Sequence, residues 1–207
     1  MTTRRSLLMA AALVASSYFG AAHADNYPSK PVRWVVAYAA GGGSDALARA
    51  VGVQLSTQLG QPVLIDNKPG GATVIGAENV AKSPGDGYTV FTADNGTLVF
   101  NTALFKKLSY DPQKDFTSIG MMARFPLLLA VNPNAGYADV KALIAAAKAN
   151  PGKLSFATPG VGSPHHLAME MLKARNNLDL VHVAYRGAAP AIQDVVGGQL
   201  PLMVVDS

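Results

Sequence analysis

The chain has 207 residues, of which 49% are hydrophobic and 14% charged, so it is long enough to bury the core of one or two domains. It contains no cysteine, which excludes disulfides and thiolate metal sites. The net charge of +4 is modest, and no cluster of basic and aromatic residues indicates nucleic-acid binding.

Residues 1–24 have the three parts of a signal peptide. Arg4 and Arg5 form a basic start, residues 7–19 form an apolar run too short to span a bilayer, and Ala22-His23-Ala24 is typical of a cleavage site. We therefore expect this segment to direct export and to be removed. The alternatives are a short N-terminal anchor and a twin-arginine signal, to which the segment is only weakly similar. The net charge of the remaining chain would be +2.

Strand and helix patterns alternate along the rest of the chain. The expected strands cover residues 32–38, 62–66, 88–93, 116–123, 127–131, 154–158, 181–185 and 200–205. The expected helices cover residues 45–59, 74–82, 138–149, 165–175 and 188–196, and residues 98–115 are expected to be irregular. This alternation predicts an α/β fold with mainly parallel sheets.

The arrangement of strand, glycine loop and helix occurs twice. Loop one is Gly41-Gly42-Gly43-Ser44-Asp45, and loop two is Pro159-Gly160-Val161-Gly162-Ser163-Pro164. Glycines let a ligand approach the backbone, and the first amides of a helix attract anions. We therefore expect two lobes, residues 25–124 and 125–207, that each present a helix N-terminus to a shared cleft.

Loop one has two other interpretations. It could be a plain turn in which Ser44 caps the helix. It also fits the G-x-G-x-x-A dinucleotide fingerprint at Gly41, Gly43 and Ala46, with Asp66 at the end of the next strand. This fingerprint would indicate an exported oxidoreductase, but a secreted protein rarely meets NAD. Asp45 is explained by its favourable position in the first helical turn, although it could also accept a hydrogen bond from a ligand.

In loop two, Ser163 and Pro164 suit the N-cap and the first position of a helix, and the Ser163 hydroxyl could equally bind a ligand carboxylate. The adjacent His165 and His166 lack the i, i+4 spacing of a zinc site, so we predict no metal. No G-x-S-x-G motif or convincing nucleophile–base pair is present, so we predict neither enzymatic activity nor a cofactor.

The last residues, Asp206 and Ser207, directly follow an apolar strand that reads as fully buried. We therefore expect the chain to be a fragment of a longer protein. A natural C-terminal strand is the alternative.

A series of short motifs follows along the chain. In order, they are Tyr27-Pro28-Ser29-Lys30-Pro31-Val32, Gly41-Gly42-Gly43-Ser44-Asp45, Gly60-Gln61-Pro62-Val63, Asn67-Lys68-Pro69-Gly70-Gly71, Pro84-Gly85-Asp86-Gly87-Tyr88-Thr89, Tyr110-Asp111-Pro112, Asp115-Phe116, Gly160-Val161-Gly162-Ser163 with His166-Leu167, and Tyr185-Arg186-Gly187-Ala188-Ala189-Pro190. Together they extend over nearly all of residues 26–207, and their order resembles that in the substrate-binding receptors of the tripartite tricarboxylate transporter (Bug) family.

The resemblance implies a two-lobed periplasmic binding protein of the type II-like, Venus flytrap kind, whose last third is absent from this chain. It implies a monomer that binds a di- or tricarboxylate, an amino acid or an aromatic acid and delivers it to a two-component membrane permease, or that acts instead as a signalling sensor. The family's ligand-binding positions correspond here to Tyr38, Gly42, Gly43, Ser44, Asp45, Thr158, Gly162, Ser163, His166 and Asp206.

The chain departs from the family pattern at several positions around the expected cleft. Ala37, Ala40 and Ala184 stand where the family often has proline, and Pro201 and Val204 stand where it often has an acid and an aromatic residue. Fewer prolines leave the loops more flexible. These departures bear on the identity of the ligand more than on the family.

Overall fold

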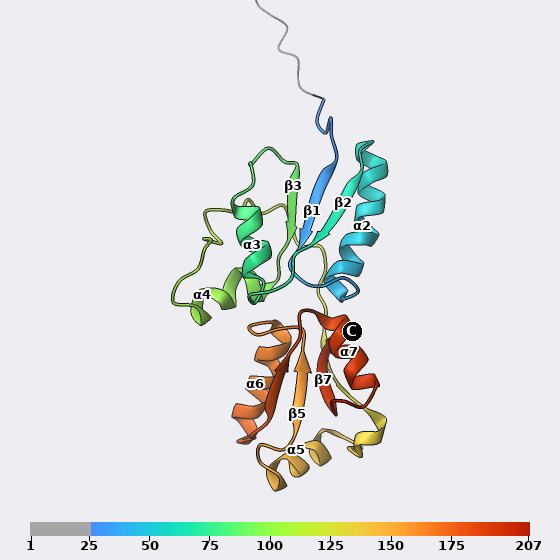
Figure 1. Ribbon diagram of the computed structural model, residues 1–207, viewed down its shortest axis with the longest axis vertical. Helices are drawn as coiled ribbons and strands as arrows, with labels where there is room; N and C mark the ends of the chain where they lie inside the picture. Colours follow the sequence, from blue (N-terminus) through green and yellow to red (C-terminus); the bar gives the residue numbers. More distant parts are fainter. Residues whose placement is uncertain (1–25) are drawn as a thin grey trace, which may run out of the picture.

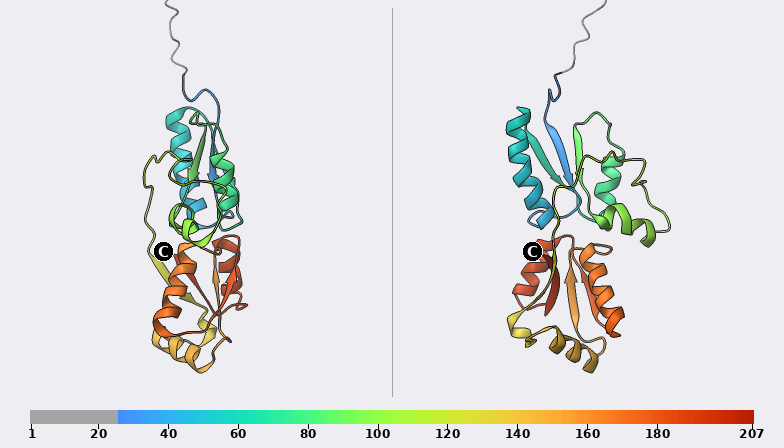
Figure 2. Two further views of the ribbon diagram at one scale, coloured as in Figure 1. Left: turned by 90° about the vertical axis from the view of Figure 1, so that its left-hand side faces the viewer. Right: turned by 180° about the vertical axis from the view of Figure 1, so that it is seen from behind.

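The computed structural model describes residues 26–207, so the predicted signal peptide lies outside the described part of the chain (Figure 1). Two sheets are present, each flanked by helices, which confirms the predicted α/β fold. We call the part that carries β1 to β3 lobe I and the part that carries β4 to β7 lobe II. The two lobes lie end to end, and the segment between α4 and β4 runs along one side of them (Figure 2).

Lobe I is built on a parallel sheet with the order β2-β1-β3. The strands are β1 (Val32–Val36), β2 (Val63–Asn67) and β3 (Thr89–Thr92), and the main helices are α2 (Gly43–Leu59) and α3 (Val74–Ala81). Strand β1 is central because it is almost entirely apolar and pairs on both edges. Trp34 and Val36 of β1 pack with Ala48 of α2 to form the core of this lobe.

Lobe II is built on a four-stranded sheet with the order β4-β7-β5-β6, in which only β4 is antiparallel to its neighbour. The strands are β4 (Leu127–Val131), β5 (Ser155–Thr158), β6 (Val181–Ala184) and β7 (Leu202–Asp206); the helices are η2 (Pro133–Ala135), α5 (Val140–Ala149), α6 (Pro164–Asn176) and α7 (Ala188–Val196). Successive residues Phe156 and Ala157 belong to different buried clusters, so helices cover both faces of this sheet.

The predicted strand at residues 116–123 is wrong, because this segment is irregular and pairs with no strand of the described chain. Phe116 instead packs against the rings of Phe91 and Tyr110, with centroids 5.6 and 5.8 Å away. Ile119 is 86% exposed. An apolar run becomes a strand only where a sheet edge is available to it, and here the chain is passing between lobes.

The expectation that residues 98–115 are irregular is wrong in part. A π-helical turn, η1 (Gly96–Phe100), continues into the short helix α4 (Asn101–Leu104). These turns form around Asn101, which is fully buried and whose Nδ2 donates to the Ala72 carbonyl oxygen at 2.8 Å. The helices within residues 26–207 are too short or too polar to cross a membrane.

Candidate functional site

The carboxyl ends of the parallel strands of both lobes point at each other, so the loops that follow them meet between the lobes (Figure 1). The Ala39 N–H, in the loop after β1, donates to the Arg186 carbonyl oxygen, in the loop after β6, at 3.0 Å. Gly187 lies so close to Ala39 that a Cβ placed on it would be 2.9 Å from the Ala39 Cβ. The two lobes are therefore in direct backbone contact.

Loop one leaves the start of α2 open. Gly42 is the N-cap, with an extended backbone and no capping side chain, so the interpretation of Ser44 as the cap is wrong. The first helical hydrogen bond runs from the Ala46 N–H to the Gly42 carbonyl oxygen at 2.9 Å. The N–H groups of Gly43, Ser44 and Asp45 have no partner within residues 26–207. Together with the helix dipole, they can bind an anion.

Asp45 fixes the shape of loop one. It is 3% exposed, its Oδ2 accepts from the Gly41 N–H and from Arg49 Nε, both at 2.9 Å, and its Oδ1 accepts from Asn67 Nδ2 at 2.9 Å. Burial disfavours the charged form, but the hydrogen bonds from Arg49, Gly41 and Asn67 outweigh it and lower the pKa of Asp45. Both of its oxygen atoms are thus engaged by the protein.

Helix α7 presents a second uncapped N-terminus directly across from loop one. Its N-cap, Gly187, offers no side-chain hydrogen bond. A Cβ on Gly41 would lie 3.2 Å from the Ala189 Cβ, and one on Gly42 would lie 3.4 Å from the Ala188 Cβ. The positive ends of α2 and α7 therefore face each other across the lobes, and both favour a negative charge between them.

Asp206, at the end of β7, brings a carboxylate to this junction. Its Oδ2 would lie 2.8 Å from a Cβ placed on Gly43, and its Oδ1 is hydrogen-bonded to His165 Nε2 at 2.9 Å. Nearby, the Tyr38 hydroxyl donates to Asp94 Oδ2 at 2.7 Å. Burial, then the charges of Asp94 and Asp206, raise the pKa of Tyr38, so its hydroxyl stays protonated.

Several polar groups of loop two are already hydrogen-bonded within the loop and to the first turn of α6. Ser163 is the N-cap of α6, as predicted, and its Oγ accepts from the His166 N–H at 3.2 Å. The same hydroxyl donates to the Gly160 carbonyl oxygen at 2.8 Å, and the Gly162 N–H donates to His166 Nδ1 at 3.2 Å. Ser163 is 2% exposed. Its hydroxyl is therefore already engaged within the loop.

Three stacked rings, those of His166, His182 and Phe156, lie next to loop two. The rings of His166 and His182 lie 4.0 Å apart between centroids, and His182 also stacks on Phe156 at 5.0 Å. Thr158 Oγ1 is hydrogen-bonded to His182 Nε2 at 2.6 Å. Burial, helped by His166, lowers the pKa of His182 to about 4, and burial also lowers the pKa of His166. His182 carries no signal of this role in the sequence, since nothing in the β6 pattern indicates which ring it will meet.

A pocket of about 570 Å³ opens between the lobes beside these loops. Both lobes contribute to its wall: Ala37, Tyr38, Pro69, Gly70, Gly71, Ala72, Thr73, Ile75, Phe105, Pro159, Gly160, Val161, Ala184, Tyr185 and Arg186. Of the ten predicted ligand residues, only Tyr38 lines it. The other nine lie at the junction of α2, α7 and β7, or in and beside loop two. In the sequence, the motif Tyr185-Arg186-Gly187 is the feature that could have indicated the lobe II wall of this pocket.

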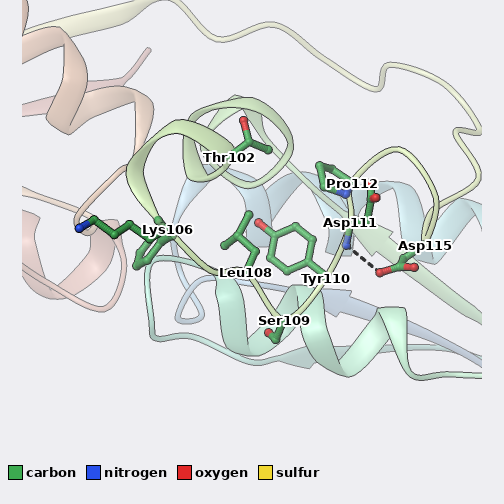
Figure 3. Close-up of a pocket in the computed structure, with 9 residues that line it drawn as sticks. Thr102, Lys106, Leu108, Ser109, Tyr110, Asp111, Pro112 and Asp115 are labelled. Carbon is green, nitrogen blue, oxygen red and sulfur yellow. Dashed lines mark hydrogen bonds between the residues drawn. The ribbon is translucent and has the colours of Figure 1, made fainter.

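A second pocket, of about 610 Å³, lies next to α4, and no residue of either glycine loop lines it (Figure 3). Several of its polar groups are bonded within the protein. The Asp111 N–H donates to Asp115 Oδ2 at 2.7 Å, and Ser109 Oγ donates to Glu78 Oε2 at 3.0 Å. It contains none of the predicted ligand residues. No group of three or more metal-ligating side chains lies within residues 26–207.

Asp66, the acid of the alternative dinucleotide fingerprint, forms ion pairs within lobe I. Its Oδ2 lies 3.3 Å from both Arg33 Nη1 and Lys68 Nζ. The carboxylate that would have to bind a ribose is thus already paired with two cationic side chains of the chain. This arrangement disfavours the dinucleotide interpretation.

Comparison with known proteins gives one consistent result. The profile of the family described as "Tripartite tricarboxylate transporter family receptor" matches residues 47–207. The UPF0065 protein in the tcbD-tcbE intergenic region of Pseudomonas sp. (strain P51) is 39% identical over 97% of this chain and 60% of its own length. The chain thus spans about 60% of that relative.

Two solved structures share this fold. R. palustris Rpa4515 with adipate has a TM-score of 0.84 and 34% identity, over 87% of this chain and 60% of that one. MatC (Rpa3494) from Rhodopseudomonas palustris with bound malate has a TM-score of 0.82 and 31% identity, over 87% of this chain and 61% of that one.

Proposed function

Since this chain belongs to the tripartite tricarboxylate transporter receptor family, we propose that it is a periplasmic solute-binding receptor that captures a small carboxylate between lobe I and lobe II. One observation carries the proposal: the amides of Gly43, Ser44 and Asp45 are unpaired within residues 26–207 and lie at the lobe junction. Two similar proteins, with adipate and with malate, are carboxylate complexes. Charge-assisted hydrogen bonds from preorganised amides are a strong means of holding a carboxylate.

In this proposal the predicted ligand residues have three kinds of role. Tyr38, Gly42, Gly43 and Ser44 border the carboxylate, and Asp45 keeps their loop in shape. Asp206 borders it from lobe II, where its Oδ2 lies against Gly43. The remaining residues of lobe II support loop two, which forms the opposite wall: Thr158, Gly162, Ser163 and His166.

The receptor would be exported by its signal peptide and act as a monomer. Binding would stabilise the contact between the lobes, for which the Ala39–Arg186 backbone bond and the close Gly187 contact provide the geometry. The closed form would then deliver its ligand to a two-component membrane permease. We propose no reaction, metal or cofactor.

Thermal unfolding in the presence of candidate ligands tests this function. The acids are succinate, citrate, glutamate and terephthalate, with NAD as the control. We expect the melting temperature to rise with the concentration of at least one acid, because a ligand that binds only the folded state stabilises it. A rise with NAD alone would replace the receptor with the dinucleotide-binding alternative.

The Gly43→Ala variant tests the position of the site. The new Cβ would lie 2.8 Å from Asp206 Oδ2, directly beside the open amides. We expect the responsive acid to bind about tenfold or more weakly, equivalent to about 1.4 kcal/mol. Gly52→Ala is the matched control in the same helix, since its nearest neighbour would be Ile65 Cδ1 at 3.4 Å. Equal affinities of the two variants would place the ligand elsewhere.

A further inference from the structure

Arg186 is the only charged residue among those that line the 570 Å³ interlobe pocket. It is exposed, and within residues 26–207 its guanidinium forms neither an ion pair nor a hydrogen bond. A guanidinium offers a planar pair of donors that matches a carboxylate. A residue that carries an unpaired cation therefore borders the pocket, and no acid of the described chain lines it.

Apolar side chains from both lobes line the same pocket. Ile75 and Phe105 come from lobe I and are 53% and 37% exposed, and Val161 comes from loop two and is 50% exposed. A ligand with an apolar body would remove these side chains from water. A strongly hydrated body would find few hydrogen-bond partners there.

The pocket adjoins the anion site of loop one. Tyr38 lines the pocket and is close enough to Asp206 for that charge to raise its pKa, while Asp206 lies against Gly43 at the start of α2. The Arg186 carbonyl oxygen accepts a hydrogen bond from the N–H of Ala39, which lies between β1 and loop one. A ligand held by the α2 amides can therefore extend past Tyr38 toward Arg186.

We propose that this receptor selects a dicarboxylate with an apolar spacer, and that Arg186 is the specificity-determining residue for the second carboxylate. This rests on the proposed function, in which the α2 amides hold the first carboxylate. Each lobe then binds one end of the ligand, so that the ligand itself joins lobe I to lobe II. An ammonium group in place of the second carboxylate finds no acid in the pocket wall.

Two acids of equal chain length isolate this contact. Adipate and hexanoate share a six-carbon chain and differ only in the second carboxylate. Their affinities are measured by calorimetry for the unaltered protein, for Arg186→Gln and for Arg175→Gln. Arg175 is an exposed arginine in the last turn of α6, outside the pocket, and controls for the loss of a surface charge.

We expect adipate to bind the unaltered protein more tightly than hexanoate. Arg186→Gln should weaken adipate about tenfold and change hexanoate by less than about twofold, because only adipate has a group to pair with the guanidinium. Arg186→Lys should recover part of the loss, since it keeps the charge but not the planar pair of donors. Arg175→Gln should leave both affinities unchanged.

Other outcomes separate this inference from the receptor function. Equal loss for adipate and hexanoate in Arg186→Gln, or no loss for either, would overturn the role of Arg186 and leave the receptor standing. The same holds if neither acid binds but citrate or glutamate does. Failure of every acid to bind would overturn the inference and the proposed function together.

Discussion

Loop one and loop two have similar sequences, each with glycines followed by a serine at the start of a helix, yet their hydrogen bonding differs. Loop one starts α2 without a side-chain cap and leaves three amides unpaired within residues 26–207. Loop two caps α6 with Ser163 and uses His166 Nδ1 to accept the Gly162 N–H. One loop is therefore suited to bind an anion, while the other is a closed and well-supported wall.

This difference follows from where each loop places its polar side chain. In loop one, the acid Asp45 lies inside the first helical turn and reaches backward to the Gly41 N–H, which leaves the following amides free. In loop two, the Ser163 hydroxyl lies at the N-cap, where it accepts from the His166 amide itself. A shift of a capping group by a few positions thus decides whether a helix N-terminus remains available to a ligand.

Asp45→Asn, which alters loop one, is expected to have the largest effect on the free energy of unfolding. The amide would place a donor or a weaker acceptor against Gly41 N–H, Arg49 Nε and Asn67 Nδ2, in a site that is 3% exposed. We expect the free energy of unfolding to fall by about 2–3 kcal/mol, because charge-assisted bonds are lost and a buried donor is left unpaired. Urea unfolding measures the loss, and ligand titration should show weaker carboxylate binding as well.

Asp179→Asn is the control for this prediction, since Asp179 is an exposed acid of lobe II. Its effect should stay within about 0.5 kcal/mol. Comparable stability of the two variants would mean that Asp45 does not hold loop one.

Ser163→Ala, which alters loop two in lobe II, should have a smaller effect on the free energy of unfolding. Loss of the N-cap is expected to cost about 1 kcal/mol in urea unfolding. The sequence also predicts about tenfold weaker ligand binding, near 1.4 kcal/mol, if the hydroxyl contacts the carboxylate. Ser163→Gly separates the two effects, because glycine at an N-cap costs only a few tenths of a kcal/mol while it also removes the hydroxyl. Affinity that follows stability across both variants would show that Ser163 serves only as a cap.

Much of the fold could be predicted from the sequence, because hydrophobic periodicity and turn residues are local signals. The predicted strands at residues 32–38 and 154–158 and the helices after them are present, and Ser163 is the N-cap of α6. The predicted strand at residues 116–123 failed because a strand also needs a free sheet edge, which the local pattern does not reveal. The buried Asn101 similarly supports α4 through a distant carbonyl oxygen, that of Ala72.

The candidate site could be predicted only in part. Both glycine loops were located, since glycine followed by a helix N-terminus is visible in the sequence. The walls formed by Ile75, Phe105 and Arg186 were not, because they become one pocket only when the two lobes meet. His182 was missed for a different reason, since its importance comes from stacking on His166 within lobe II, between β6 and α6.

Acidification should produce the smallest effect, and it should act on loop two. His182 has a pKa of about 4, below its ordinary value of 6.5, so folding favours its neutral form. Its contribution to stability is therefore fully present above pH 6.5 and is lost as the pH falls toward 4. We expect the melting temperature to decline over this interval, and to decline less steeply in His182→Gln. Glu170 and Lys173 of α6 lie beside the same stack and act in opposite directions, since Glu170 raises the pKa of His182 and Lys173 lowers it. Identical slopes for the two proteins would show that the titration of His182 contributes nothing to the pH dependence of stability.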